Sequence, residues 1–309
     1  MPKSKPKPSK NTAKANPLPP LNPSTIAAES PSHFGDPLYF PYARYVGVVG
    51  VHSSLLLFSF LFLPRTTMLF EATKPIIDPS LLTSRDRPQH PFLEDLTASP
   101  VLTVAWTCLG AMVLQAWWGG SVRDWWIGYS LRGSEEERRI ERVKLNNTKL
   151  IQVVRAWLFT LAASVPFHFI IVLLGAPIAS HILQTYFLAL LLSVLMFFAP
   201  AYTFGLPSGS SQNEHLLIRL TWIRLFAEFS IRTPIERAMV YSAVGAISGC
   251  WLGAIPIALD WDRPWQAWPL TPAFGAVLGY VLASMLALTV SIVKSLADEH
   301  IRSQNQKTE

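Results

Sequence analysis

ILQTYFLALLLSVLMFFAPAYTF, the stretch at 182–204, contains no Asp, Glu, Lys or Arg. Coiled as an α-helix, this stretch is about 35 Å long, which is enough to cross the roughly 30 Å hydrocarbon core of a bilayer. A helix also satisfies its backbone hydrogen bonds within the segment, as lipid surroundings require. The stretch therefore predicts a transmembrane helix.

Five further stretches of similar length also lack charged residues: 45–63, 101–118, 156–174, 239–259 and 270–293. Only 15% of the 309 residues are charged, compared with about 25% in ordinary soluble domains. One Arg at the centre of a span costs about 2.5–3.5 kcal/mol on the insertion scale, so six such stretches reflect a bilayer. We predict an all-α membrane protein, a polytopic bundle of six transmembrane helices.

The distribution of positive charge predicts the orientation. With six spans, most of the 26 Lys and Arg residues lie on the side that holds both termini. The positive-inside rule therefore places both termini in the cytosol. Residues 1–44 are expected to form a disordered cytosolic tail, since the stretch 1–41 is rich in proline and has no apolar run. The transmembrane domain is expected at 45–294, followed by a cytosolic tail at 295–309.

Several function classes lack the residues that they require. The net charge is +6, but no basic run is interleaved with aromatic residues outside the spans, so nucleic-acid binding is not expected. No Gly-x-Ser-x-Gly, P-loop or HExxH motif is present. Cys108 and Cys250 both fall within spans and are interpreted as packing residues. We expect no catalytic residue, no metal site and no cofactor.

The segments predicted on the lumenal or outer side are short. They are 64–100, 175–181 and 260–269. Even taken together, these segments are too small for a hydrolase or transferase domain of ordinary size.

The most distinctive stretch, ALDWDRPWQAWP, occupies residues 258–269 on that side. Its charged and aromatic residues are the candidate contacts to a partner protein or to lipid: Asp260, Trp261, Asp262, Arg263 and Trp265. Tryptophans are typical of the membrane interface, and a guanidinium can bind a phosphodiester. The alternative is a local salt bridge between Arg263 and an aspartate that only fixes the hairpin. Two carboxylates in one turn do not make a metal site.

The preceding hairpin adds His181 and Gln184 as further contact candidates. Gly175 and Pro177 break the helix, and Gln184 and Thr185 follow His181 by three and four residues. This spacing predicts three hydrogen-bonding groups on one helix face. A histidine at the interface could carry protons, but it more often bonds a neighbouring carbonyl.

Small residues recur at four-residue steps in the last two spans. Gly245, Gly249 and Gly253 lie in one span, and Gly275 and Gly279 lie in the other. Such residues let helix backbones approach closely in lipid. We expect the two spans to pack on each other, with packing against a partner's helix as the alternative.

The cytosolic segment 205–238 carries a polar stripe at Thr221, Arg224, Glu228 and Arg232. These positions share one face of an α-helix that is otherwise apolar. The pattern predicts one helix at the membrane interface, which either connects two spans or binds anionic headgroups.

At this point the sequence resembles a known family. The run WLGAIPIALDWDRPWQAWP at 251–269, followed by Gly275 and Gly279-Tyr280, resembles the signature of the PIG-F family of glycosylphosphatidylinositol (GPI) anchor biosynthesis. The segment 175–185 resembles an earlier hairpin of the same family. The resemblance extends roughly over the six spans and suggests a fungal member.

The resemblance implies a non-catalytic, multi-pass subunit in the endoplasmic reticulum membrane. Its implied partners are the large transferases that add phosphoethanolamine to mannose of the GPI precursor, together with membrane lipids. Two other classes remain open. One is an enzyme acting through the 260–263 turn, and the other is a lipid transporter or scramblase, although the two halves of the chain share no repeated motif.

Overall fold

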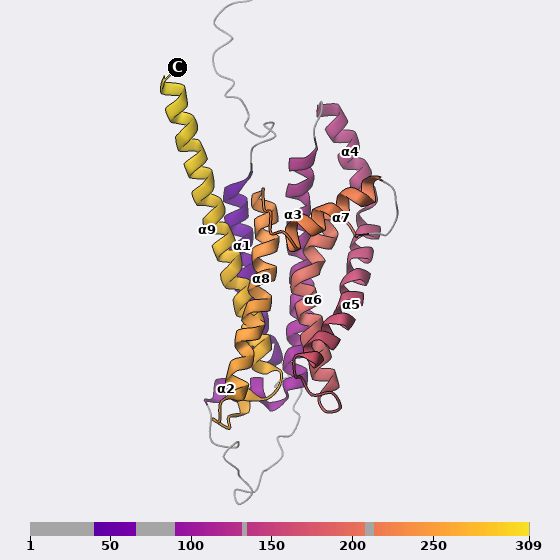
Figure 1. The fold of residues 1–309 in the computed structure, drawn as a ribbon, viewed down its shortest axis with the longest axis vertical. Helices are drawn as coiled ribbons and strands as arrows, with labels where there is room; N and C mark the ends of the chain where they lie inside the picture. Colours follow the sequence, from indigo (N-terminus) through magenta and orange to yellow (C-terminus); the bar gives the residue numbers. More distant parts are fainter. Residues whose placement is uncertain (1–39, 66–89, 132–134, 208–212, 309) are drawn as a thin grey trace, which may run out of the picture. The chain divides into compact units, whose positions relative to one another are not determined.

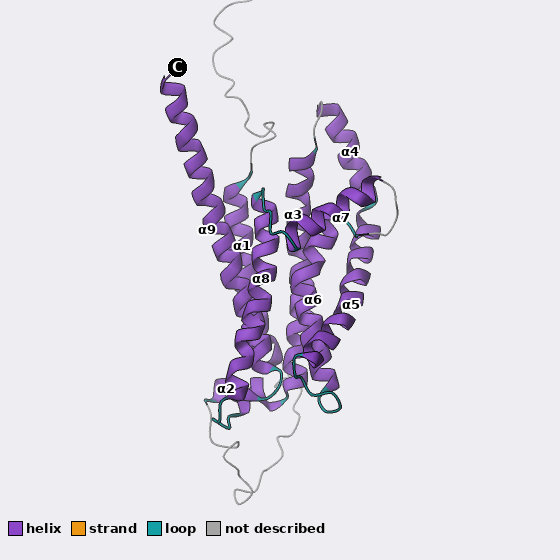
Figure 2. Ribbon diagram, viewed as in Figure 1, coloured by secondary structure: helices purple, strands orange, loops and turns teal. Residues whose placement is uncertain are grey.

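The computed structural model describes residues 40–65, 90–131, 135–207 and 213–308. Within these residues every regular element is a helix, and no strand occurs (Figures 1 and 2). The α-helices are α1 Tyr42–Phe62, α2 Pro91–Ala98, α3 Pro100–Ser130, α4 Glu135–Asn147, α5 Lys149–Leu173, α6 Ile182–Phe204, α7 Asn213–Phe226, α8 Pro234–Ala254 and α9 Leu270–Thr308. Two short 3₁₀ helices, η6 Ile255–Ala258 and η7 Pro264–Gln266, lie between α8 and α9.

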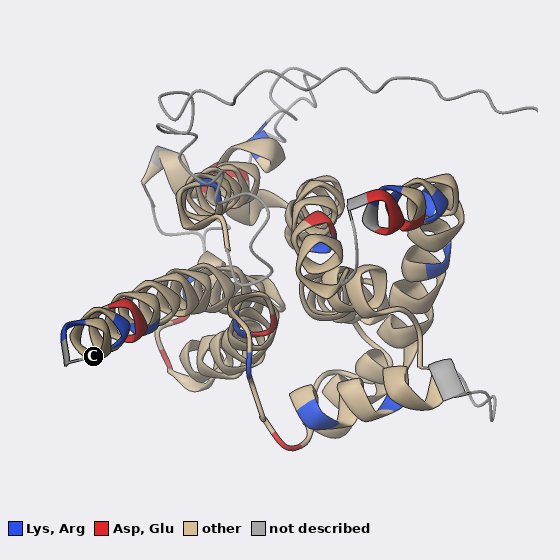
Figure 3. Cartoon of the chain, turned by 90° about the horizontal axis from the view of Figure 1, so that it is seen from above, with Lys and Arg blue, Asp and Glu red and all other residues tan. Residues whose placement is uncertain are grey.

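Six of the described helices are long and apolar enough to cross a membrane, namely α1, α3, α5, α6, α8 and α9. The prediction of an all-α polytopic bundle is therefore confirmed. Helix α3 continues past the charge-free window at 101–118 and ends at Ser130. Helix α9 likewise runs to Thr308, and charged positions gather near its C-terminal end (Figure 3). The orientation of the termini and the disordered tail remain predictions, and residues 1–39 lie outside the described part.

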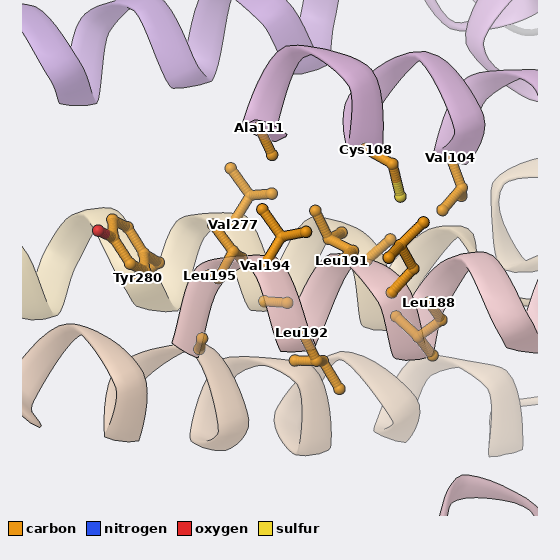
Figure 4. Packing of buried hydrophobic residues seen from close by; sticks show 14 of the residues in the cluster. Val104, Cys108, Ala111, Leu188, Leu191, Leu192, Val194, Leu195, Val277 and Tyr280 are labelled. Atoms are coloured by element: carbon orange, nitrogen blue, oxygen red, sulfur yellow. The ribbon is translucent and has the colours of Figure 1, made fainter. Parts of the chain in front are cut away.

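Helix α6 forms the centre of the largest hydrophobic cluster. Figure 4 shows Leu191 and Val194 of α6 on the side that faces α3, and Leu192 on the opposite side of the helix. The Cys108 thiol on α3 is buried among them and donates a hydrogen bond to the Phe187 carbonyl at 3.2 Å. In this setting Cys108 acts as a small packing residue.

The prediction of one polar helical stripe through residues 221–232 is wrong beyond Phe226, where α7 ends. Phe229 has a φ of 51°, a left-handed conformation that an α-helix does not contain. Glu228 and Arg232 consequently do not share a helix face with Arg224. Residues 227–231 contain no glycine or proline, the residues that commonly mark the end of a helix in sequence.

Glu236 connects this chain reversal to α8. Its buried carboxylate accepts hydrogen bonds from the Arg224 guanidinium and from the backbone N–H groups of Arg232 and Thr233. The Thr233 hydroxyl accepts in return from the Glu236 N–H at 3.1 Å, which completes a capping box. One carboxylate thus links the end of α7 to the start of α8.

A candidate interaction site at the last hairpin

The turn between α8 and α9 is fixed by Gln266. Its Nε2 donates to the carbonyls of Pro256 at 2.6 Å and Leu259 at 2.8 Å. Its Oε1 accepts from the Arg263 N–H at 2.7 Å. These three bonds tie both short 3₁₀ helices together, so an amide side chain holds the loop that presents the charged residues.

The candidate residues of this turn are accessible. Trp261 is 55% exposed, and its ring lies 5.6 Å from that of Trp265 in an edge-to-face arrangement. Asp260 is exposed, and the other candidates are half-buried. Asp262 has a φ of 48°, which turns the chain sharply at this point. The turn can therefore offer an indole pair beside carboxylate and guanidinium groups.

The preceding hairpin is joined to this turn through Trp268, which is not among the contact candidates predicted from the sequence. Trp268 Nε1 donates to the Thr185 hydroxyl at 3.0 Å. Thr185 is fully buried and donates to the His181 carbonyl at 3.1 Å. Residues 83 positions apart thus meet at one end of the bundle. Helix α2 also packs beside η7 there.

The other two candidates of that hairpin lie differently from Thr185. His181 is exposed and has a φ of 63° at the start of α6. Gln184 is half-buried, and its Oε1 has no hydrogen-bond partner among the described residues. The structure brings Thr185 to the last hairpin, and no described hydrogen bond connects His181 or Gln184 to the charged turn.

The glycines of α8 and α9 face each other at very close range. A Cβ atom added to Gly249 would lie 2.0 Å from the Gly275 carbonyl oxygen, and one added to Gly245 would lie 2.3 Å from the Gly279 oxygen. Gly253 meets the Thr271 carbonyl in the same way. In this structure the glycine face of α8 is occupied by α9 of the same chain.

The described residues contain no group of three or more His, Cys, Asp or Glu side chains placed to hold a metal ion. What the described part offers instead is an ordered, exposed polar turn at one end of a helical bundle. Fold and turn together define a polytopic α-helical membrane protein with an exposed polar turn between its last two spans.

The family model described as GPI biosynthesis protein family Pig-F matches residues 88–288. The chain belongs to this family, as the resemblance of the last hairpin predicted. No solved structure matches the chain.

Three curated relatives illustrate the similarity. Glycosylphosphatidylinositol anchor biosynthesis protein 11 of Pyricularia oryzae is 42% identical over 127 residues, which cover 41% of this chain and 42% of the relative. The protein of the same name from Debaryomyces hansenii is 35% identical over 47% of this chain and 58% of the relative. The human GPI ethanolamine phosphate transferase, stabilizing subunit, is 30% identical over 45% of this chain and 58% of the relative. The matches thus span about half the length of these relatives.

Proposed function

We propose that this protein is a non-catalytic membrane subunit that binds and stabilises a GPI ethanolamine-phosphate transferase. Membership of the Pig-F family carries the proposal, and the human relative's name describes this role. The proposed site of action is the endoplasmic reticulum membrane, where the large transferase subunit and membrane lipids would be its partners.

The exposed part of the chain supports an accessory role. The segments on the side predicted to be lumenal, 64–100, 175–181 and 260–269, are together too small for a transferase domain. The ordered turn around Gln266 can nevertheless dock against a larger lumenal domain. The Trp261 and Trp265 pair, with Asp260, Asp262 and Arg263, is the contact that we propose. His181 and Gln184 are proposed contacts on the neighbouring hairpin.

The test uses the full chain, tagged and purified in mild detergent from cells that contain the transferase. The double variant Asp260→Ala with Arg263→Ala should reduce recovery of the transferase, because it removes two charged groups from the exposed turn. Glu228→Ala is the matched control, since Glu228 is an exposed acid near the end of α7. Normal recovery and normal GPI synthesis in the double variant would remove the turn from the interface.

The same preparation separates the subunit from an enzyme. We expect phosphoethanolamine transfer to a mannosylated GPI lipid only when the large partner is present, and loss of activity when the partner's own catalytic residues are mutated. Activity of the purified chain alone, dependent on Asp260 or Asp262, would overturn the proposed function.

A further inference from the structure

Polar side chains lie inside the bundle where α1, α3, α8 and α9 approach one another. Each is within a helix long enough to span a membrane, and each has at most 2% of its surface exposed. They are Tyr45 and His52 of α1, Gln115 and Trp118 of α3, Ser242 of α8 and Tyr280 of α9. We call this group the interior polar cluster.

The cluster is continuous in space. The centroid of the His52 ring lies 5.2 Å from the ring centroid of Trp118 and 5.8 Å from that of Tyr280. The Tyr280 hydroxyl lies beside the side chains of Gln115 and Ser242 and within electrostatic range of Tyr45. Four helices therefore direct polar groups toward one interior region.

Many of these groups lack hydrogen bonds within the described part of the chain. Five buried atoms have no partner in hydrogen-bond geometry among the described residues: Tyr45 Oη, His52 Nε2, Gln115 Oε1, Gln115 Nε2 and Trp118 Nε1. Leaving one buried polar group unsatisfied costs about 1–3 kcal/mol. Five such costs together are comparable to the net stability of a typical domain, which favours partners supplied by another molecule.

Arg237 extends the cluster to the start of α8. Its side chain is within electrostatic range of Tyr45, and Nη1 donates to Ser291 Oγ at 2.8 Å. Arg237 is only 5% exposed. Arg224, in contrast, has the carboxylate of Glu236 as its partner. Among the described residues this buried guanidinium has one neutral hydrogen-bond partner, which leaves its other N–H groups in need of acceptors.

We propose that water molecules bind within the interior polar cluster and form a hydrated path from Arg237 to His52. Water is small enough for a tightly packed bundle and both donates and accepts, as this mixture of amide, imidazole, hydroxyl, indole and guanidinium groups requires. A buried water needs two to four polar partners, and the cluster offers them on four helices. The bound water links α1 to the other three helices through hydrogen bonds in addition to apolar packing.

The test is radiolytic hydroxyl labelling of the full chain in lipid nanodiscs, read by mass spectrometry after exchange into ¹⁸O water. Radicals form from water at the site, so a buried side chain is labelled only where water is bound beside it. After correction for intrinsic reactivity, Tyr280 and Trp118 should be labelled clearly more than Phe60. Phe60 is the control because it is 4% exposed and its ring packs edge-to-face against Phe274. Equal labelling of Tyr280, Trp118 and Phe60 would overturn the proposal.

A pair of variants on α3 adds a second readout. Gln115→Leu removes two polar atoms from the cluster and should lower the labelling of Tyr280, because the bound water loses partners. Thr107→Val is the matched control, because Thr107 is 1% exposed but its hydroxyl already bonds the Thr103 carbonyl. Equal loss of labelling in both variants would contradict a specific water site, and the wild-type comparison remains decisive if either variant fails to fold.

Discussion

At the scale of single residues, the Glu236 carboxylate is a buried ion-pair partner with several hydrogen bonds. It accepts hydrogen bonds from two backbone N–H groups and from the Arg224 guanidinium, and only 2% of its side chain is exposed. We predict that Glu236→Ala lowers the free energy of unfolding by about 3–5 kcal/mol, because it leaves a guanidinium without its counter-charge. Thermal unfolding in detergent measures the change.

The control for Glu236 is again Glu228, an exposed acid close in sequence. Glu228→Ala removes the same charge and should change stability by less than about 0.5 kcal/mol. An equal loss in both variants would show that net charge, rather than the buried contact, is responsible.

Gln266 is a second residue with a separable role. It touches the backbone of the turn rather than a partner, so Gln266→Ala should loosen the turn and weaken transferase recovery while the proposed contact residues of the turn stay in place. Gln266→Glu should also fail, since a carboxylate cannot donate to the Pro256 and Leu259 carbonyls. Unchanged recovery in both variants would mean that the ordered turn is not required for binding.

The residue scale also shows where the sequence is informative. Asp260 and Arg263 stand out in the amino-acid sequence because charged residues are rare around them. The role of Gln266 cannot be predicted from the sequence, because its partners are carbonyls that only the folded turn brings within reach. The capping box of Thr233 and Glu236 has the spacing of a recognised motif, but the third partner, Arg224, lies on another helix.

At the scale of helices, the contact between α8 and α9 depends on missing side chains. We predict that Gly249→Ala forces the helices apart, because the new Cβ would lie 2.0 Å from the Gly275 oxygen. The expected loss of stability is about 1–3 kcal/mol, as for other overpacked interiors, and thermal unfolding of the purified chain measures it.

Gly47 on α1 provides the matched control, since a Cβ added there meets no atom within 4 Å. Gly47→Ala should leave stability unchanged or raise it by about 0.5–1 kcal/mol through helix propensity. If Gly249→Ala behaved like Gly47→Ala, the close approach of α8 and α9 would be refuted.

The two predicted helical patterns differ in outcome for a physical reason. Glycines at four-residue steps lie on one helix face whatever surrounds them, and α8 and α9 are uninterrupted over those positions. The prediction of a polar stripe through 221–232 required one continuous helix, but α7 ends at Phe226. The helix ends before a left-handed residue, Phe229, that is neither glycine nor proline, so the sequence pattern gives no sign of this end.

At the scale of the whole molecule, the six helices follow from the exclusion of charge from lipid, which acts on each segment separately. The way in which the helices pack on one another cannot be predicted from this exclusion of charge. The interior polar cluster requires residues from four helices to converge, so single-chain spacing cannot reveal it. His52 looks like an isolated histidine in sequence, yet it lies 5.8 Å from Tyr280 on the last helix.

The orientation of the bundle is a property of the whole chain and has its own test. The native sequon at Asn146 should carry no glycan, because the positive-inside rule places its segment in the cytosol, where glycan transfer does not occur. A new sequon made by Asp78→Asn with Pro79→Ala, using the existing Ser80 in the segment 66–89 outside the described residues, should be glycosylated. Mobility on gels before and after endoglycosidase treatment reads both sites. A glycan at Asn146, with none at the new sequon, would invert the orientation and move the proposed contact turn to the cytosolic side, away from a lumenal transferase domain.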